Sequence, residues 1–80
     1  MKTLLFTRGA LKSLRKMPRR DSQAILAKLK SFARGEEQDI VKLQGSEGYR
    51  LRHGDWRALF VLSENEITVA AIEHRREAYR

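Results

Sequence analysis

The sequence predicts an α+β fold in the order β-α-α-β-β-β, with an antiparallel sheet packed on a helical hairpin. Two adjacent stretches near the N-terminus repeat apolar residues every three or four positions, which is typical of amphipathic helices. The second half instead alternates apolar and polar residues between turns, which is typical of strands. Helices that run together and strands that run together favour α+β.

The chain begins with a short apolar run, residues 2–6, that we interpret as the first strand, although so short a run is ambiguous by pattern alone. Thr7 is a suitable N-cap for the first helix. The apolar face of this helix consists of Ala10, Leu11, Leu14 and Met17. Pro18 ends it, because the residue before a proline is disfavoured in the helical region.

The second helix restarts after the proline, with Asp21 or Ser22 as its cap. Gly35 is a natural C-terminal stop. The short link between the helices predicts an antiparallel hairpin. The apolar stripe of the second helix consists of Ile25, Leu26, Leu29, Phe32 and Ala33.

Residues 36–48 are the least regular stretch, and we expect them to connect the helices to the sheet. Residues 48–62 then read as two strands joined by a tight turn at residues 53–55, where glycine supplies the backbone freedom that a hairpin needs. Residues 63–65 form the next turn. The β-branched run at residues 67–72 predicts the last strand.

Arginines alternate with apolar residues in the predicted hairpin. Because strand side chains alternate with a period of two, Arg50 and Arg52 share the face opposite Tyr49, Leu51 and His53. On the second strand Arg57 shares a face with Leu59 and Val61, whereas Trp56, Ala58, Phe60 and Leu62 lie on the other. A cation on such a face must be paired or must line a site. We expect the helices to cover one sheet face and leave the other as a working surface.

Length and composition exclude several classes of protein. Eighty residues make one domain with a thin core, which implies marginal stability or a partner that completes it. The absence of cysteine excludes disulfides and thiolate metal sites, and two distant histidines do not predict a zinc site, so we expect no metal or cofactor. With no apolar run of membrane-spanning length and no signal peptide, we expect a cytoplasmic protein with no membrane partner.

The net charge is +7, from 17 Lys and Arg against 10 Asp and Glu, and the whole surplus lies in residues 1–20. That segment contains no acidic residue. Such asymmetry favours a nucleic acid or an acidic protein as partner; the alternative is a basic helix face that is merely solvated. The basic residues of the segment are Lys2, Arg8, Lys12, Arg15, Lys16, Arg19 and Arg20.

The chain has no phosphate-binding loop, serine nucleophile elbow, HExxH or CxxC motif. A set of arginines with one histidine and one tyrosine suits RNA cleavage, because guanidinium groups bind phosphoryl oxygens and stay charged. Histidine transfers protons near neutral pH, so His74 is a candidate acid–base residue. Tyr79 can take the 2′-hydroxyl proton or stack on a base. The set is Arg50, Arg52, Arg57, His74, Arg75, Arg76 and Tyr79.

Two runs in this part of the chain, YRLRHGDWR at residues 49–57 and HRREAYR at residues 74–80, resemble the RelE/ParE superfamily of bacterial toxins, most of all its RelE branch. The resemblance implies the RelE-like microbial RNase fold and a toxin of a type II toxin–antitoxin system. It implies cleavage of mRNA in the ribosomal A site by 2′-hydroxyl attack. The implied partners are the ribosome with its mRNA and a RelB-like antitoxin, with DNA bound only through the antitoxin complex.

The resemblance also implies roles for individual residues. Arg57 would stabilise the phosphate, Arg50 and Arg52 would bind the scissile region, Arg75 would assist, and Tyr79 would orient or activate the 2′-hydroxyl. His74 as general base is our hypothesis, and Glu47 and Glu77 are further acid–base candidates. We expect the basic residues of the first helix and the following link to contact ribosomal RNA through phosphates: Lys12, Arg15, Lys16, Arg19 and Arg20.

Two other functions stay open from the sequence. The chain could be a ParE-like, non-enzymatic inhibitor of DNA gyrase, or a degenerate member that binds RNA or its antitoxin without cleaving. The tail, with His74, Arg75 and Tyr79, is more similar to the nuclease branch. Each residue also has a structural interpretation: Arg57 could pair with Asp55 or Glu73, and Trp56 is expected in the core.

Overall fold

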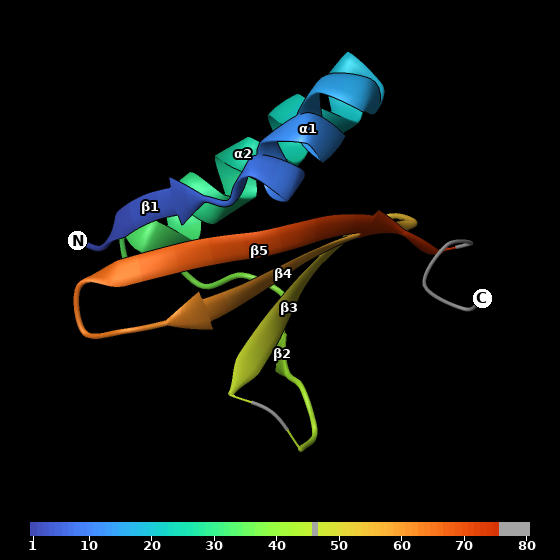
Figure 1. The fold of residues 1–80 in the computed structure, drawn as a ribbon. Helices are drawn as coiled ribbons and strands as arrows, with labels where there is room; N and C mark the ends of the chain where they lie inside the picture. The colour runs from blue at the N-terminus through green and yellow to red at the C-terminus, as the bar shows by residue number, and fades with distance from the viewer. Residues whose placement is uncertain (46, 76–80) are drawn as a thin grey trace.

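A computed structural model describes residues 1–45 and 47–75. Its two helices and five strands follow each other along the chain as in Figure 1. The elements are β1 (Thr3–Phe6), α1 (Arg8–Lys16), α2 (Arg19–Ala33), β2 (Ile40–Lys42), β3 (Gly48–His53), β4 (Trp56–Leu62) and β5 (Glu66–His74). No helix in these two described ranges is long and apolar enough to cross a membrane.

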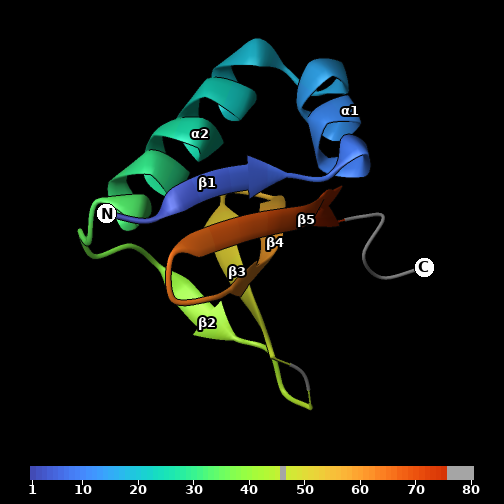
Figure 2. The same ribbon diagram turned by 60° about the vertical axis from the view of Figure 1, so that its left-hand side comes forward.

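The five strands form one sheet in the order β1-β5-β4-β3-β2. Strands β2 to β5 pair antiparallel with their neighbours, whereas β1 lies parallel beside β5. Both helices lie on the same side of the sheet, and no helix or strand of residues 1–45 and 47–75 covers the opposite side (Figures 1 and 2). The predicted α+β class, with a helical hairpin against a sheet, is therefore confirmed.

Two features of the sheet differ from the prediction. The sheet is mixed rather than wholly antiparallel, because the direction of β1 depends on pairing with a strand sixty residues away in sequence (Thr3 pairs with Glu66). The connection after the helices also contains β2, which the sequence analysis missed. This strand has three residues, and it forms because Ile40 and Val41 pair with Leu51 and Arg50 of β3.

The start of α1 is as predicted. The side chain of Thr7 caps the helix, since its Oγ1 accepts a hydrogen bond from the backbone N–H of Ala10 at 3.2 Å. The same hydroxyl donates to the carbonyl of Ala70 at 2.7 Å, which ties the start of α1 to β5.

The start of α2 corrects the prediction, because the helix begins at Arg19 and Pro18 occupies the N-cap position without a side-chain hydrogen bond. The backbone N–H groups of Asp21 and Ser22 both donate to the carbonyl of Pro18 at 3.0 Å. Asp21 therefore lies inside the first turn, where a carboxylate is favoured by the helix dipole, and its side chain is available to contact another element.

The core lies between the helices and the inner sheet face. Its largest fully buried side chains are Phe60, Ile25, Leu29, Leu51, Ile67 and Val69. Phe60 stacks between helix and strand, with ring centroids 5.6 Å from Phe32 and 5.7 Å from Tyr49. The predicted alternation is confirmed here, because Leu51, Ala58 and Phe60 are buried on the helix side.

The β3–β4 hairpin closes through a two-residue turn between the paired residues His53 and Trp56. Gly54 in this turn has φ of +56°, a conformation that favours glycine. The turn fixes which residues of the two strands lie side by side, and so places the arginines described next.

Candidate active site

The outer sheet face, on the side away from the helices, holds three arginines of the hairpin. Arg52 of β3 lies directly opposite Arg57 of β4, and Arg50 lies one row along, opposite Leu59. Directly opposite residues on one sheet face have Cβ atoms about 5 Å apart, so two guanidinium groups can reach a common anion. On its other side Arg57 is paired in register with Glu73 of β5. The structure thus brings together the three hairpin arginines named from the sequence.

Arg50 has an unsatisfied donor. Its side chain is partly buried, and its Nε is buried with no hydrogen-bond partner among the described residues. A buried N–H group without an acceptor costs about 1–3 kcal/mol, more when the group is charged. The flanking residues in its row are Val41 and Leu59, which offer no side-chain acceptor. An anionic oxygen from a bound molecule would satisfy this donor.

Exposed apolar side chains also lie on the outer face. Leu5, Val41 and Val61 expose 40%, 45% and 45% of their surface. Val41 lies beside Arg50, whereas Leu5 and Val61 flank Thr68 toward the other end of the sheet. Exposed apolar residues on a face that also holds cations suit a surface that another molecule covers. This face therefore has the chemistry of a binding surface.

His74 lies on the other side of the sheet. It pairs with Trp56 across β4 and β5, on the face that the helices cover. Its ring meets the Trp56 indole in a T-shaped arrangement, with centroids 4.8 Å apart and planes at 80°. Arg57 is the neighbour of Trp56 in sequence, but it points to the opposite face. The sheet therefore does not place His74 beside the hairpin arginines.

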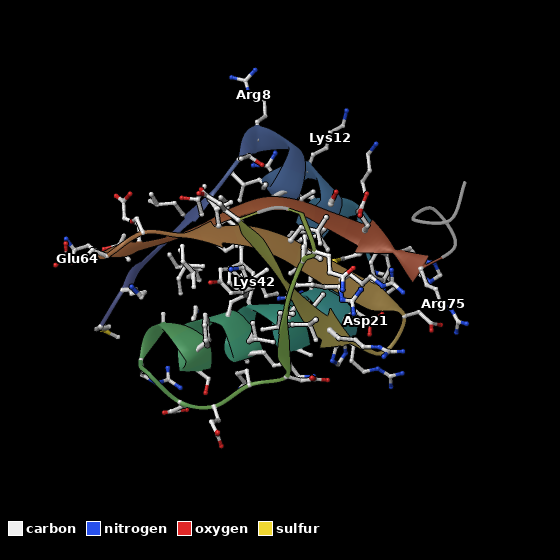
Figure 3. The ribbon with its side chains drawn as sticks, turned by 90° about the horizontal axis from the view of Figure 1, so that it is seen from below. Arg8, Lys12, Asp21, Lys42, Glu64 and Arg75 are labelled. Atoms are coloured by element: carbon white, nitrogen blue, oxygen red, sulfur yellow. The ribbon has the colours of Figure 1, made fainter. Side chains whose placement is uncertain are left out.

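Arg75 is held at the hairpin turn. Its backbone N–H donates to the carbonyl of Asp55 at 2.6 Å, and its Nη1 lies 3.9 Å from Asp55 Oδ1. Both side chains are exposed. The chain thus leaves β5 next to the turn of β3 and β4, at the end of the sheet that carries Arg52 and Arg57 (Figure 3).

Of the remaining acid–base candidates, the structure describes only Glu47, which is not part of this arrangement. Glu47 is exposed before Gly48, at the opposite end of β3 from Arg52. Tyr79, Arg76 and Glu77 lie outside the described residues. Within the described ranges, His, Asp and Glu form no group of three that could hold a metal ion.

The basic residues predicted to bind RNA line the helix layer. Arg8 and Lys12 point away from the sheet along α1 (Figure 3). This set is separate from the hairpin arginines, because it lies on the other layer of the molecule. All members of the predicted set are exposed on α1 or at the start of α2: Lys12, Arg15, Lys16, Arg19 and Arg20.

Asp21 is a residue of this region that the sequence analysis assigned only to helix capping. Its Oδ2 accepts a hydrogen bond from Trp56 Nε1 at 3.2 Å, and its Oδ1 lies 3.4 Å from His53 Nε2. His53 and Trp56 are the pair that flanks the hairpin turn, and the next pair along is Arg52 with Arg57. A signal was present in the sequence, since Asp21 is the first acidic residue after twenty residues that contain none.

The fold has counterparts among solved structures. The chain has a TM-score of 0.81 and 22% identity with a chain of the RelB–RelE antitoxin–toxin complex from Methanococcus jannaschii, over 94% of each chain. With a chain of the heterotetrameric YoeB–YefM toxin–antitoxin complex from Staphylococcus aureus, the TM-score is 0.76 and the sequence identity is 19%, over 92% of this chain and 97% of that one. With YafQ from E. coli strain BL21(DE3), the TM-score is 0.79 and the sequence identity is 10%, over 100% of each chain.

No curated protein matches this chain in sequence. The family model described as the ParE toxin of type II toxin–antitoxin systems, parDE, does match it, over residues 4–79. That match spans nearly the whole chain, including both helices and all of the sheet except the first residue of β1. The chain therefore belongs to the ParE toxin family, within the RelE/ParE superfamily of type II toxin–antitoxin toxins.

Proposed function

We propose that this toxin is an endoribonuclease that cuts mRNA in the ribosomal A site. The observation that carries the proposal is the strand pairing in the β3–β4 hairpin. It places Arg52 directly opposite Arg57 on the sheet face away from the helices, with Arg50 in the next row. Like charges directly opposite each other destabilise a sheet. Glu73 lies in register beside Arg57 on its other side, and a further anion between Arg57 and Arg52 would reduce the repulsion of the two cations. A phosphodiester is the anion of RNA.

The reaction follows from the chemistry of that anion. The 2′-hydroxyl oxygen attacks the adjacent phosphorus, and the bond from phosphorus to the 5′-oxygen breaks. The products are a 2′,3′-cyclic phosphate and a 5′-hydroxyl. Negative charge grows on the phosphoryl oxygens in the transition state, and fixed guanidinium groups stabilise it without reorganising. We assign this role first to Arg57, with Arg50 and Arg52 binding the scissile region.

Two proton transfers complete the reaction, since the 2′-hydroxyl loses a proton and the 5′-oxygen gains one. We assign them to His74 and Tyr79, with Arg75 assisting. The contact of Arg75 with Asp55 supports the role of Arg75, because it holds this residue at the end of the sheet that carries Arg52 and Arg57. The ring of His74 packs against Trp56 on the helix side, so it can act only on a substrate that passes around the end of the sheet to that side.

The basic helix layer supports a role for the ribosome. Its exposed cations lie on a different layer from the hairpin arginines, so they can hold ribosomal RNA while the sheet face meets mRNA. Much of the rate would then come from positioning the substrate. We therefore expect free RNA to be a poor substrate, and we place the activity in the cytoplasm.

The uncovered sheet face supports an antitoxin that blocks the site. Exposed Leu5, Val41 and Val61 share this face with the arginines, so an acidic, amphipathic segment lying across it would bury the apolar groups and pair the cations. We propose a RelB-like antitoxin in this role.

The test is cleavage of an mRNA on programmed ribosomes, mapped by primer extension beside the same mRNA without ribosomes. The proposal predicts cuts in the A-site codon only when ribosomes are present. Absence of cuts in both reactions would reject the nuclease function.

A second candidate is non-enzymatic inhibition of DNA gyrase. The observation that favours it is the family match, which is to ParE toxins. Arginines on an open sheet face can bind an acidic protein surface without any acid–base chemistry. A gyrase supercoiling assay distinguishes the two functions, because the nuclease is expected to leave supercoiling unchanged.

A further inference from the structure

We propose that a pocket at the end of α1 binds one nucleotide of the RNA, with its base stacked on Trp56. The pocket has a volume of about 330 Å³ and lies between the last turn of α1 and the ends of β4 and β5. It is lined by Ser13, Lys16, Met17, Trp56 and Ile72. Its size suits a small ligand rather than a protein segment. This inference rests on the proposed function and adds a binding subsite to it.

Trp56 is held as a fixed platform. Its Nε1 donates to Asp21 Oδ2 at 3.2 Å, and His74 packs against the ring with centroids 4.8 Å apart. The indole is nevertheless only partly buried, because the pocket opens beside it. A ring that is already fixed loses little conformational entropy when a base stacks on it. Aromatic platforms of this kind bind bases with little sequence preference.

The other lining residues fit the rest of a nucleotide. Lys16 is exposed and supplies a cation for a phosphate, while Ser13 supplies a hydroxyl for a ribose or phosphate oxygen. Both belong to the segment of residues 1–20 that contains no acid. The nearby carboxylate of Asp21 already lies within reach of Trp56 and His53. Protein sites for single-stranded RNA combine an aromatic face for the base with cations and hydrogen-bonding groups for the phosphate and ribose.

The pocket lies at the end of the sheet that carries the hairpin arginines. Trp56 and Arg57 are consecutive, and so are His74 and Arg75. Since consecutive strand residues point to opposite faces, the pocket and the arginine pair lie on the two sides of one sheet end. An RNA strand that crosses this end places one base in the pocket and a neighbouring phosphate on Arg57. The pocket thus fixes the register of the RNA at the cleavage site.

Trp56 is the single tryptophan of the chain, so intrinsic fluorescence reports on this pocket directly. The experiment is a titration of the full chain with a 2′-O-methylated trinucleotide, which cannot be cut by 2′-hydroxyl attack. N-acetyltryptophanamide corrects for absorption by the nucleotide. We expect saturable quenching by the trinucleotide and none by inorganic phosphate at the same concentration. No saturable quenching, or equal quenching by phosphate, would overturn the proposal.

Matched variants distinguish binding in the pocket from general attraction of RNA to a basic protein. Lys16→Gln is expected to raise the Kd about fivefold, whereas Lys30→Gln, the same change near the far end of α2, is expected to leave it unaltered. Trp56→Leu, followed by anisotropy of a labelled trinucleotide, is expected to weaken binding about tenfold or more. Equal Kd values for Lys16→Gln and Lys30→Gln would overturn the assignment of the phosphate to Lys16 and with it the proposed site.

The cleavage assay keeps this proposal distinct from the nuclease function. Arg57→Ala is expected to retain quenching while it loses cleavage. Saturable quenching by a toxin that never cuts on ribosomes would support the pocket and reject the nuclease. Cleavage by a toxin whose fluorescence does not respond would reject the pocket and keep the nuclease.

Discussion

Asp21 links the helix layer to the hairpin through a single carboxylate. It contacts both His53 and Trp56, the residues on either side of the turn, and is only partly exposed. The two contacts hold the first turn of α2 against the strand ends that precede Arg57. This residue therefore joins the stability of the fold to the geometry of the candidate site.

We expect Asp21→Ala to destabilise the protein by about 1–2 kcal/mol, because the change removes an acceptor from two partly buried donors. Urea unfolding measures this effect. Asp39→Ala, which removes an exposed carboxylate before β2, is the matched control and is expected to change stability little. Equal effects of the two changes would contradict a role for the contacts of Asp21.

The sequence predicted which arginines share a face, but not the position of His74. Arg50, Arg52 and Arg57 follow the period of two, and local alternation suffices for them. Strand β5 has an irregularity opposite Leu59 and Phe60, so that Val69 and Ala71 pair with these consecutive residues. The extra residue, Ala70, reverses the alternation beyond it and turns His74 toward the helices. A β-bulge of this kind depends on the partner strand and leaves no local pattern.

The elements begin and end largely where local chemistry places them. Thr7 and Gly35 bound the helical hairpin as predicted, and Gly54 closes β3 onto β4. Strand β2 could not be predicted, because three residues form a strand only through their pairing with β3. The parallel pairing of β1 depends on the same long-range contacts.

The cap of α1 is testable by itself. Thr7→Ala removes the hydrogen bond to Ala10 and the bond to the carbonyl of Ala70, so we expect a loss of about 1–2 kcal/mol in urea unfolding. Thr7→Ser keeps the hydroxyl and is expected to retain most of the stability. A serine variant as unstable as the alanine variant would show that the hydroxyl is not what matters.

The end of α2 is expected to respond to pH. Hydrogen bonds from Ser31 and Arg34, and the charge of Arg34, hold the pKa of Glu36 below the ordinary glutamate value of 4.5. A lowered pKa means that the folded state favours the charged form. The stabilisation is therefore complete above the ordinary pKa and is lost as the pH falls through the lower value.

We expect Glu36→Gln to lower the urea midpoint near neutral pH, and this difference from the unmodified protein to disappear in acid below the pKa of Glu36. Glu37→Gln removes a neighbouring exposed carboxylate and serves as the control. A difference for Glu36→Gln that persists unchanged in acid would contradict the role of its ionised form.

At the scale of the whole molecule, the basic residues fall into two groups, one in the helix layer and one on the sheet. The surplus of +7 arises in residues 1–20, mostly in the helix layer, whereas the hairpin arginines lie on the uncovered sheet face. The core between these layers consists of eleven buried apolar side chains among the described residues. A partner on the uncovered face would bury apolar groups that this small core leaves outside, which is consistent with an antitoxin.

If the helix layer binds ribosomal RNA as proposed, we expect the binding to depend on salt, because each phosphate contact releases counterions. We expect the logarithm of the affinity to fall linearly with the logarithm of salt concentration. The double variant Lys12→Gln, Arg15→Gln should reduce the slope by about two, one for each lost contact. Lys30→Gln with Arg34→Gln removes the same charge at the far end of α2 and should leave the slope nearly unchanged. Equal slopes for both pairs would show that α1 is not the contact surface.

The most direct test of the arginine site is the cleavage rate of Arg57→Ala on programmed ribosomes, with Arg34→Ala as a control at the far end of α2. Loss of one fixed charge-stabilising donor costs a factor of about 100 to 1,000. We expect this loss for Arg57→Ala, an intermediate rate for Arg57→Lys and a full rate for Arg34→Ala, with all three variants folded by circular dichroism. Cleavage by Arg57→Ala at the full rate would contradict the assignment of the site to the outer sheet face.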